Sequence, residues 1–209
     1  MNRRNFIATG ILGTMVGSGF LSETLAQLPG DKPRAITNRI KKRRPLKPLY
    51  VKPDNSPNFR SGAKIRFAQT NNQFSAWERI ILPKTMGPAP HLHKDLDEAM
   101  RVLKGMVTVM VGETLVQVEE GGWHLRPHGL VHTFWNATDK PAIVLEIYPN
   151  QNFEVYLEEL KKLFAGFAQK NIPPDSEEAV TSINALDKEW GVVTYHDQRK
   201  VLMEKYGLK

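Results

Sequence analysis

The chain has 209 residues, of which 41% are hydrophobic and 24% charged, as expected for one globular domain with extensions. It contains no cysteine, which excludes disulfides, thiolate ligands and a cysteine nucleophile, so any metal must be held by His, Asp or Glu. The formal net charge is +7, but residues 31–52 alone hold nine Lys or Arg against one acidic residue, and the rest is close to neutral. Because the excess charge belongs to one segment, we expect no nucleic-acid partner for the folded body.

The first 27 residues are typical of an export signal. The segment Arg3–Ile7 (RRNFI) resembles the twin-arginine (Tat) signal motif, and the apolar run that follows is too short and glycine-rich for an ordinary membrane span. Thr24–Ala26 offers small residues for cleavage before Gln27. We therefore expect residues 1–26 to be a Tat-type signal peptide and the mature protein to be periplasmic or secreted. The alternatives are an uncleaved anchor and a buried N-terminal helix.

Residues 27–61 are predicted to form a basic arm that contains several prolines. Its run Lys41–Arg44 could by itself bind nucleic acid, but that interpretation does not fit a protein that follows an export signal. We expect instead an extended arm that packs on the domain, contacts anionic lipid at a membrane surface or binds a partner. A solvated linker is the alternative.

Residues 62–150 carry a regular strand pattern. Short runs of alternating polarity are separated by Gly, Asn and Pro, and the expected strands are Ala63–Gln69, Gln73–Leu82, Asp97–Lys104, Met106–Val111, Thr114–Val118, Trp123–Arg126, Val131–Asn136 and Ala142–Tyr148. Strands of this length and spacing predict an all-β sandwich or a small barrel. The interior of such a barrel suits one small ligand.

Residues 151–209 are predicted to form a helical extension. Apolar residues from Phe153 to Phe164 repeat with helical spacing, and Pro173-Pro174 is expected to end that helix. A capping box, Asp175–Glu178, is expected to open a second helix that closes at Gly191, and a short third helix covers residues 198–206. We interpret the apolar faces as packing surfaces, over the β-structure or in a dimer seam.

Four side chains form a potential metal site: His91, His93, Glu98 and His132. His91 and His93 are two residues apart, so on a strand they point to the same face. We expect Glu98 on the neighbouring strand and His132 on a distant strand brought alongside. Three imidazoles and one carboxylate suit a single divalent Fe, Mn, Ni, Cu, Co or Zn ion. On an octahedral ion this set leaves two positions for water, dioxygen or a chelating substrate, whereas a four-coordinate zinc would be closed.

The spacing of these residues resembles the two motifs of the cupin superfamily. The first is read as His91-x-His93-x4-Glu98-x6-Gly105, and the second as Gly121-x5-Pro127-x-Gly129-x2-His132-x3-Asn136. One position departs from the family pattern, because Thr85 stands where the first motif has a glycine, which affects a turn and not a ligand. The resemblance implies a cupin double-stranded β-helix, or jelly-roll barrel, with a C-terminal α-helical extension, and a homodimer.

Within the superfamily, the chain resembles the single-domain, quercetin-dioxygenase-like cupins, in which a helical tail follows the barrel. This resemblance implies a metal-dependent, dioxygenase-like oxidoreductase in which Glu98 is both metal ligand and catalytic base. Since cupins have many unrelated functions, two alternatives stay open. The same ligands could serve a metal-dependent isomerase or hydrolase, or the protein could be a non-catalytic module that binds or senses a small ligand.

Strand parity indicates which other side chains surround the site. Met100, Val102 and Phe134 are expected to point inward with Glu98 and His132, giving an apolar pocket for a small apolar or aromatic substrate that chelates the metal through oxygen. Glu146 and Glu78 could be acids behind the ligands or exposed residues. His124 and His128 are expected at the surface or rim, and His196 has no evident partner in the sequence.

Overall fold

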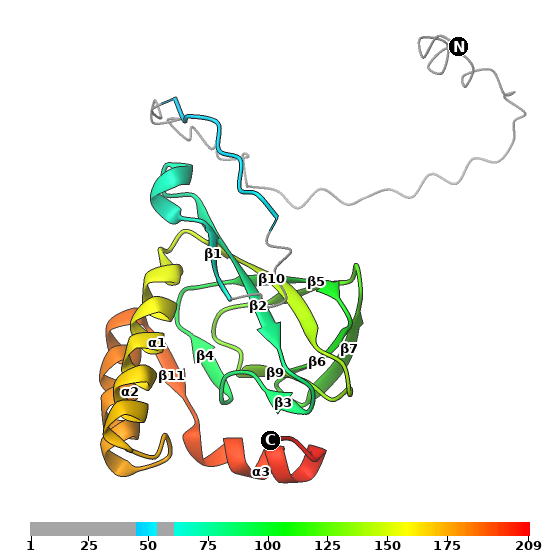
Figure 1. Cartoon of the computed structure of the whole chain (residues 1–209), viewed down its shortest axis with the longest axis vertical. Coiled ribbons are helices and arrows are strands. Elements are labelled where there is room, and N and C mark those ends of the chain that lie inside the picture. The colour runs from blue at the N-terminus through cyan, green and yellow to red at the C-terminus, as the bar shows by residue number, and fades with distance from the viewer. Residues whose placement is uncertain (1–44, 54–60) are drawn as a thin grey trace, which may run out of the picture. The chain divides into compact units, whose positions relative to one another are not determined.

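The computed structural model describes residues 45–53 and 61–209 (Figure 1). The expected signal peptide at 1–26 and most of the basic arm at 27–61 lie outside the described residues. Residues 45–53 are exposed and have no regular secondary structure. No helix in the part of the chain that the structure describes is long and apolar enough to cross a membrane.

Two antiparallel sheets make up the β-structure. The first has the order β1 (Gly62–Ile65), β2 (Phe74–Ile81), β10 (Ala142–Pro149), β5 (Glu98–Lys104) and β8 (Trp123–Arg126). The second has the order β11 (Val192–Thr194), β4 (His91–His93), β9 (His132–Asn136), β6 (Met106–Val111) and β7 (Thr114–Glu119), with β3 (Thr85–Met86) paired to β9. Spatial neighbours are thus often far apart in sequence. The predicted jelly-roll fold is confirmed, as two facing sheets rather than a closed barrel.

A hydrophobic core joins the two sheets. Its buried members come from both of them and are Ile81, Met100, Val102, Val107, Val109, Val118, Phe134 and Val144. Along β10, buried and partly exposed residues alternate, as expected for a strand with one face inside a sandwich. The inward positions of β10 change from Ala142 and Val144 at one end to Glu146 and Tyr148 at the other. The interior is therefore apolar at one end and polar at the other.

The first expected strand, Ala63–Gln69, is shorter than predicted. β1 ends at Ile65, and Phe67–Thr70 form a short 3-10 helix, η1. The Gln69 side chain accepts a hydrogen bond from the Arg66 backbone N–H at 2.8 Å, and Asn71 closes the turn in the left-handed conformation at φ 54°. These local contacts favour a turn over the strand. The strands β3 and β11 were not predicted, because two or three residues are too short to show an alternating pattern.

Three helices follow the sheets: α1 (Phe153–Lys170), α2 (Glu177–Trp190) and α3 (His196–Tyr206). α1 ends at Asn171, whose left-handed backbone caps the helix before the prolines are reached. The N-cap of α2 is Ser176 and not Asp175, because the Ser176 hydroxyl accepts the N–H of Ala179. Gly191 closes α2 as predicted.

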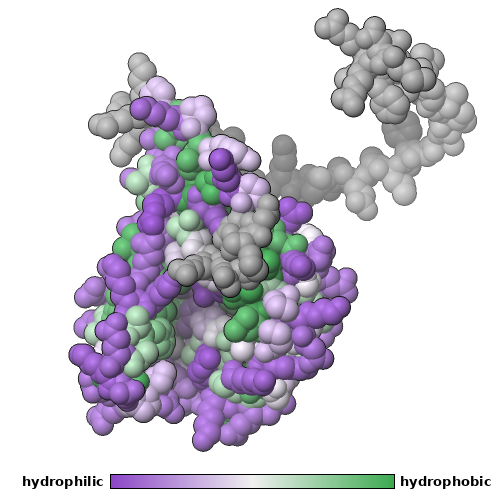
Figure 2. Space-filling model, in the orientation of Figure 1, coloured by the Kyte–Doolittle hydropathy of each residue, from purple (hydrophilic) through white to green (hydrophobic). Residues whose placement is uncertain are grey.

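The helical extension is joined to the sheets through aromatic packing and one buried acid. Phe153 and Tyr156 of α1 pack with Trp77, Leu96, Tyr148 and Val192 in a second core. The Asp187 carboxylate of α2 accepts the Tyr156 hydroxyl at 2.7 Å and the Thr194 hydroxyl of β11 at 2.6 Å. In Figure 1, α1 and α2 lie along one side of the sheets and α3 beneath their lower end, where Tyr206 stacks on Trp135. In the view of Figure 2, hydrophilic residues cover most of the surface over α1 and α2.

Candidate metal centre

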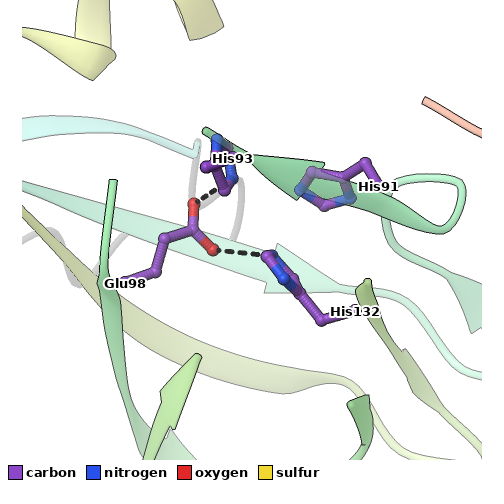
Figure 3. A group of neighbouring side chains, drawn as sticks. All are labelled: His91, His93, Glu98 and His132. Carbon is purple, nitrogen blue, oxygen red and sulfur yellow. Dashed lines mark ion pairs between the residues drawn. The ribbon is translucent and has the colours of Figure 1, made fainter. Parts of the chain in front are cut away.

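The four predicted residues come together inside the sandwich, from both sheets (Figure 3). His91 and His93 are on β4, and His132 lies directly opposite His91 on the adjacent strand β9. Glu98 begins β5, which belongs to the other sheet. The prediction that Glu98 stands on the strand next to the histidines was therefore wrong. The polar segment Lys94–Asp97 carries the chain from one sheet to the other, so the carboxylate faces the imidazoles across the interior.

The cluster is compact and buried. One potential ligand atom from each residue lies within 4.8 Å of the others. The Glu98 carboxylate spans two rings, with Oε1 at 3.2 Å from His93 Nε2 and Oε2 at 3.3 Å from His132 Nε2. The ring centroids of His91 and His132 are 4.4 Å apart. All four residues are at most 8% exposed.

Hydrogen bonds fix the orientation of two imidazoles. His91 Nδ1 lies 2.9 Å from the carbonyl oxygen of Ala89, and His132 Nδ1 lies 2.9 Å from that of Leu130. Since only a protonated Nδ1 can donate to a carbonyl, the lone pair of each neutral ring is on Nε2. His93 Nε2 and His132 Nε2 are buried and have no hydrogen-bond partner among the described residues. Unpartnered lone pairs that share one small space with a carboxylate fit a metal ion.

The ionisation of the cluster also suits a metal. Burial, together with the neighbouring His132 and His93, lowers the pKa of His91 well below 6.5, so the ring is neutral. Burial alone would raise the pKa of Glu98, but Arg126 and His93 outweigh it and hold the pKa well below 4.5. A neutral imidazole, as at His91, and an anionic carboxylate, as at Glu98, are the forms that bind divalent transition metals. The residues present therefore fit such an ion, and the donor set does not distinguish among Fe, Mn, Ni, Cu, Co and Zn.

Backbone and ring contacts hold the histidine strand in place. Gly129, with a left-handed φ of 73°, donates its N–H to the carbonyl of His93 at 2.7 Å. This bond ties the turn before His132 to the strand that carries the other two rings. On the opposite edge of β4, β11 pairs with it so that Val192 faces His93. The Phe153 ring of α1 packs edge-on against His93 at 4.9 Å. The helical extension thus directly contacts one of the rings of the cluster.

Arg126 is a site residue that the sequence reasoning missed. It is the cross-strand partner of Glu98, and its side chain is fully buried. Its Nη2 lies 2.9 Å from Glu146 Oε1 and 3.1 Å from Glu98 Oε2, while Arg79 Nε donates to Glu146 Oε2 at 2.9 Å. Glu146 is therefore an inward acid behind the cluster. Alternating polarity in β8 pointed the other way, because the apolar Trp123 and Leu125 are exposed while the charged Arg126 takes the inward position.

The three predicted pocket residues are all buried. Met100, Val102 and Phe134 belong to the hydrophobic core between the sheets, and the Arg126 guanidinium lies 5.1 Å over the Phe134 ring. That they line a substrate pocket stays a prediction. Glu78, in contrast to Glu146, is partly exposed and pairs with Lys64 at 3.3 Å.

The other histidines lie outside the cluster. His128 is exposed and its Nδ1 is 2.7 Å from Asp97 Oδ1, whereas His124 is partly buried. His196 does have a partner, since its Nε2 lies 3.1 Å from Asn184 Oδ1. This contact joins α3 to α2, which are separate in the sequence. A surface groove of about 370 Å³ between Lys94, α2 and β11 contains none of the four cluster residues.

Part of the β-structure matches a known protein family. Residues 77–148 match the family described as Cupin domain, and this segment holds all four cluster residues. Over these residues the chain is similar to a cupin domain. No curated protein matches the chain significantly.

Several solved structures are similar to parts of the chain. A double-stranded β-helix protein from Klebsiella pneumoniae is 19% identical, covering 49% of this chain and 85% of its own, with a TM-score of 0.39. A cupin protein from Bacteroides fragilis is 15% identical, covering 50% and 83%, with a TM-score of 0.42. An oxalate oxidase is 25% identical, covering 47% and 54%, with a TM-score of 0.39, so the chain spans about half of its length.

Proposed function

We propose that the cupin domain binds one divalent transition metal and that the protein is an exported, dioxygenase-like oxidoreductase. Its substrate would be a small apolar or aromatic molecule that chelates the metal through oxygen. The observation that carries the proposal is the buried cluster of His91, His93, Glu98 and His132, with unpartnered nitrogen lone pairs facing one carboxylate. When bound, the metal would supply a Lewis acid with open positions for substrate and dioxygen.

The residues of the cluster and Arg126 have distinct roles in this proposal. The three imidazoles hold the ion as neutral donors, and the Nδ1 bonds of His91 and His132 keep their Nε2 atoms aimed at it. Glu98 is the fourth ligand and the proposed base. Because Arg126 stabilises the Glu98 anion, this carboxylate is a weak base, suited to an acidic enol or phenol hydroxyl rather than a carbon acid.

The metal site is tested by elemental analysis of the purified protein beside a His91→Ala/His93→Ala variant. We expect about one metal ion per chain in the wild type and loss of the metal in the variant. A His128→Ala/His196→Ala variant removes two histidines outside the cluster and should keep the metal. If the first variant retains metal at the wild-type stoichiometry, the site assignment is wrong.

The reaction class is tested by dioxygen consumption with a panel of flavonols and catechols. Metal-dependent consumption that stops in the His91→Ala/His93→Ala variant would support the oxidoreductase. Substrate turnover without dioxygen consumption would point to an isomerase or hydrolase. Ligand binding without any turnover would reject an enzyme in favour of a binding or sensing module.

Export by the Tat route is part of the proposal. An Arg3→Lys/Arg4→Lys variant should keep the protein out of the periplasmic fraction, because an arginine pair distinguishes Tat signals from others. Equal periplasmic amounts for variant and wild type would contradict Tat export.

The partners of the mature protein are proposed to be a second copy of the chain and, through the basic arm, an anionic membrane surface. Sedimentation analysis should give the mass of a homodimer. Binding to vesicles with anionic lipid should weaken on deletion of residues 31–52 and at high salt. Binding to DNA that depends on the same segment would contradict the expectation of no nucleic-acid partner.

A further inference from the structure

The buried guanidinium of Arg126 makes fewer hydrogen bonds than it can. A guanidinium has five N–H donors, and the contacts of Arg126 with Glu146 and Glu98 both use Nη2. Arg126 Nε and Nη1 are buried and have no hydrogen-bond partner among the described residues. A buried, charged donor without an acceptor is costly, so the arrangement calls for an acceptor that the protein itself does not provide.

The unpartnered donors lie beside the metal cluster. Arg126 Nη2 is 3.1 Å from Glu98 Oε2, and that oxygen is 3.3 Å from His132 Nε2. One face of the guanidinium is closed by the Phe134 ring at 5.1 Å, which excludes water from that side. A molecule bound at the cluster could therefore place one of its oxygens against the remaining donors of Arg126.

The balance of charge around the cluster also favours an anion. The carboxylates of Glu98 and Glu146 are matched by the guanidinium groups of Arg79 and Arg126, and an imidazole that binds a metal is neutral and adds no charge. A divalent ion would bring two uncompensated positive charges into a buried space. An anionic ligand would restore neutrality where desolvated charge is most costly.

We propose that Arg126 is the anion-binding residue of this site, and that the substrate carries a carboxylate or similar oxyanion beside its metal-chelating oxygen. The inference rests on the proposed metal-dependent function and narrows its substrate class. Arginine suits this part because its planar, permanently charged donors recognise carboxylates with high strength. Its bonds to Glu98 and Glu146 fix the direction of the donors that are left.

The test is calorimetric titration of the metal-free and the Zn(II)-loaded chain near neutral pH, which needs no turnover. The probes are acetate and benzoate, compared with the uncharged acetamide and benzamide. We expect the wild type to bind at least one carboxylate about tenfold or more tightly than its amide, as for one charge-assisted hydrogen bond. The preference should be present in the metal-free chain, through the Arg126 donors, and larger in the Zn(II)-loaded chain, because the ion adds two positive charges. A wild type without any preference for the carboxylates overturns the proposal.

Three variants distinguish an anion-binding role of Arg126 from a purely structural role. Arg126→Lys keeps the positive charge between the two carboxylates but lacks the extra donors, so the carboxylate-to-amide ratio should fall about tenfold. Arg126→Met/Glu146→Gln removes one buried charge of each sign and should lose the preference as well. Arg101→Met removes an exposed arginine from the outer face of β5 and should leave the ratio unchanged.

An unchanged ratio in folded Arg126→Lys and in the double variant would mean that buried water satisfies the donors, and the inference would be wrong. The outcome of this binding test does not depend on whether the proposed reaction with dioxygen occurs. An Arg126-dependent preference in the metal-free protein stands even if no dioxygen is consumed. Conversely, dioxygen consumption with an Arg126-independent preference would reject this inference alone.

Discussion

The contact between Phe153 and His93 predicts that the helical extension contributes to metal binding. Phe153 is 3% exposed, and its ring meets three others: His93 edge-on at 4.9 Å, Tyr148 at 5.0 Å and Tyr156 in a stack at 4.6 Å. In Phe153→Leu most of the apolar volume stays, but the ring contacts are lost. At about 0.5–1.5 kcal/mol for each aromatic pair, the expected loss of unfolding free energy for three pairs is about 1.5–4.5 kcal/mol. At about 2–4 °C for each kcal/mol in a domain of this size, the melting temperature should fall by about 3–18 °C.

Metal affinity should fall together with stability, because His93 loses the ring that fixes its orientation. Residues that orient metal ligands typically contribute about tenfold or more to affinity. Urea denaturation followed by circular dichroism gives the first quantity, and competition with a chelator gives the second. The matched control is Phe164→Leu on the same helix, whose 39% exposed ring makes one ring contact among the described residues, edge-on with Phe167 at 5.9 Å; it should lose at most about 1.5 kcal/mol and leave metal affinity unchanged. If Phe153→Leu costs no more stability than the control and keeps the metal affinity of the wild type, the reasoning is refuted.

Three further predictions concern the acids and turns behind the cluster. Glu146→Gln leaves two guanidinium groups without their shared carboxylate and should cost about 3–5 kcal/mol by urea denaturation at neutral pH; an unchanged midpoint would contradict a paired Glu146. Burial would raise the pKa of Glu146, but Arg79 and Arg126 hold it below 4.5, so its stabilisation is present above pH 4.5 and lost as the pH falls through the lowered pKa. Unfolding of Glu146→Gln should therefore depend less on pH below 4.5 than that of the wild type, and equal slopes would count against this assignment. Gly129→Ala should lose about 1 kcal/mol by calorimetry, because the added Cβ meets no atom within 4 Å and only the left-handed backbone at φ 73° is strained. Gly166→Ala, inside α1 with equally open space, should instead gain about 0.5–1 kcal/mol, and a loss for both would mean that backbone conformation does not decide the sign.

Much of the fold follows from local patterns. Alternating polarity located the longer strands because each has one face inside the sandwich, and helical spacing located α1 and α2 because each buries one stripe. Strand parity within His91–His93 correctly placed both imidazoles on the same side. The patterns failed at two places for different reasons, one a tertiary contact and one a local contact. β11 is only three residues long and is a strand because β4 offers it an edge, and η1 replaces the end of a predicted strand because Gln69 bonds back to Arg66.

The amino-acid sequence by itself determined which side chains meet in the cluster, because the spacing of His91, His93, Glu98 and His132 is a property of the chain. Only the tertiary structure decided how they meet. It placed Glu98 on the facing sheet, since sheet membership depends on pairing between strands distant in sequence. The same pairing brought Arg126 beside Glu98 and Glu146 behind both, a set of charges that no local pattern joins. The spacing of the sequence thus determines the candidate metal ligands, whereas the pairing of distant strands determines which charged side chains surround them.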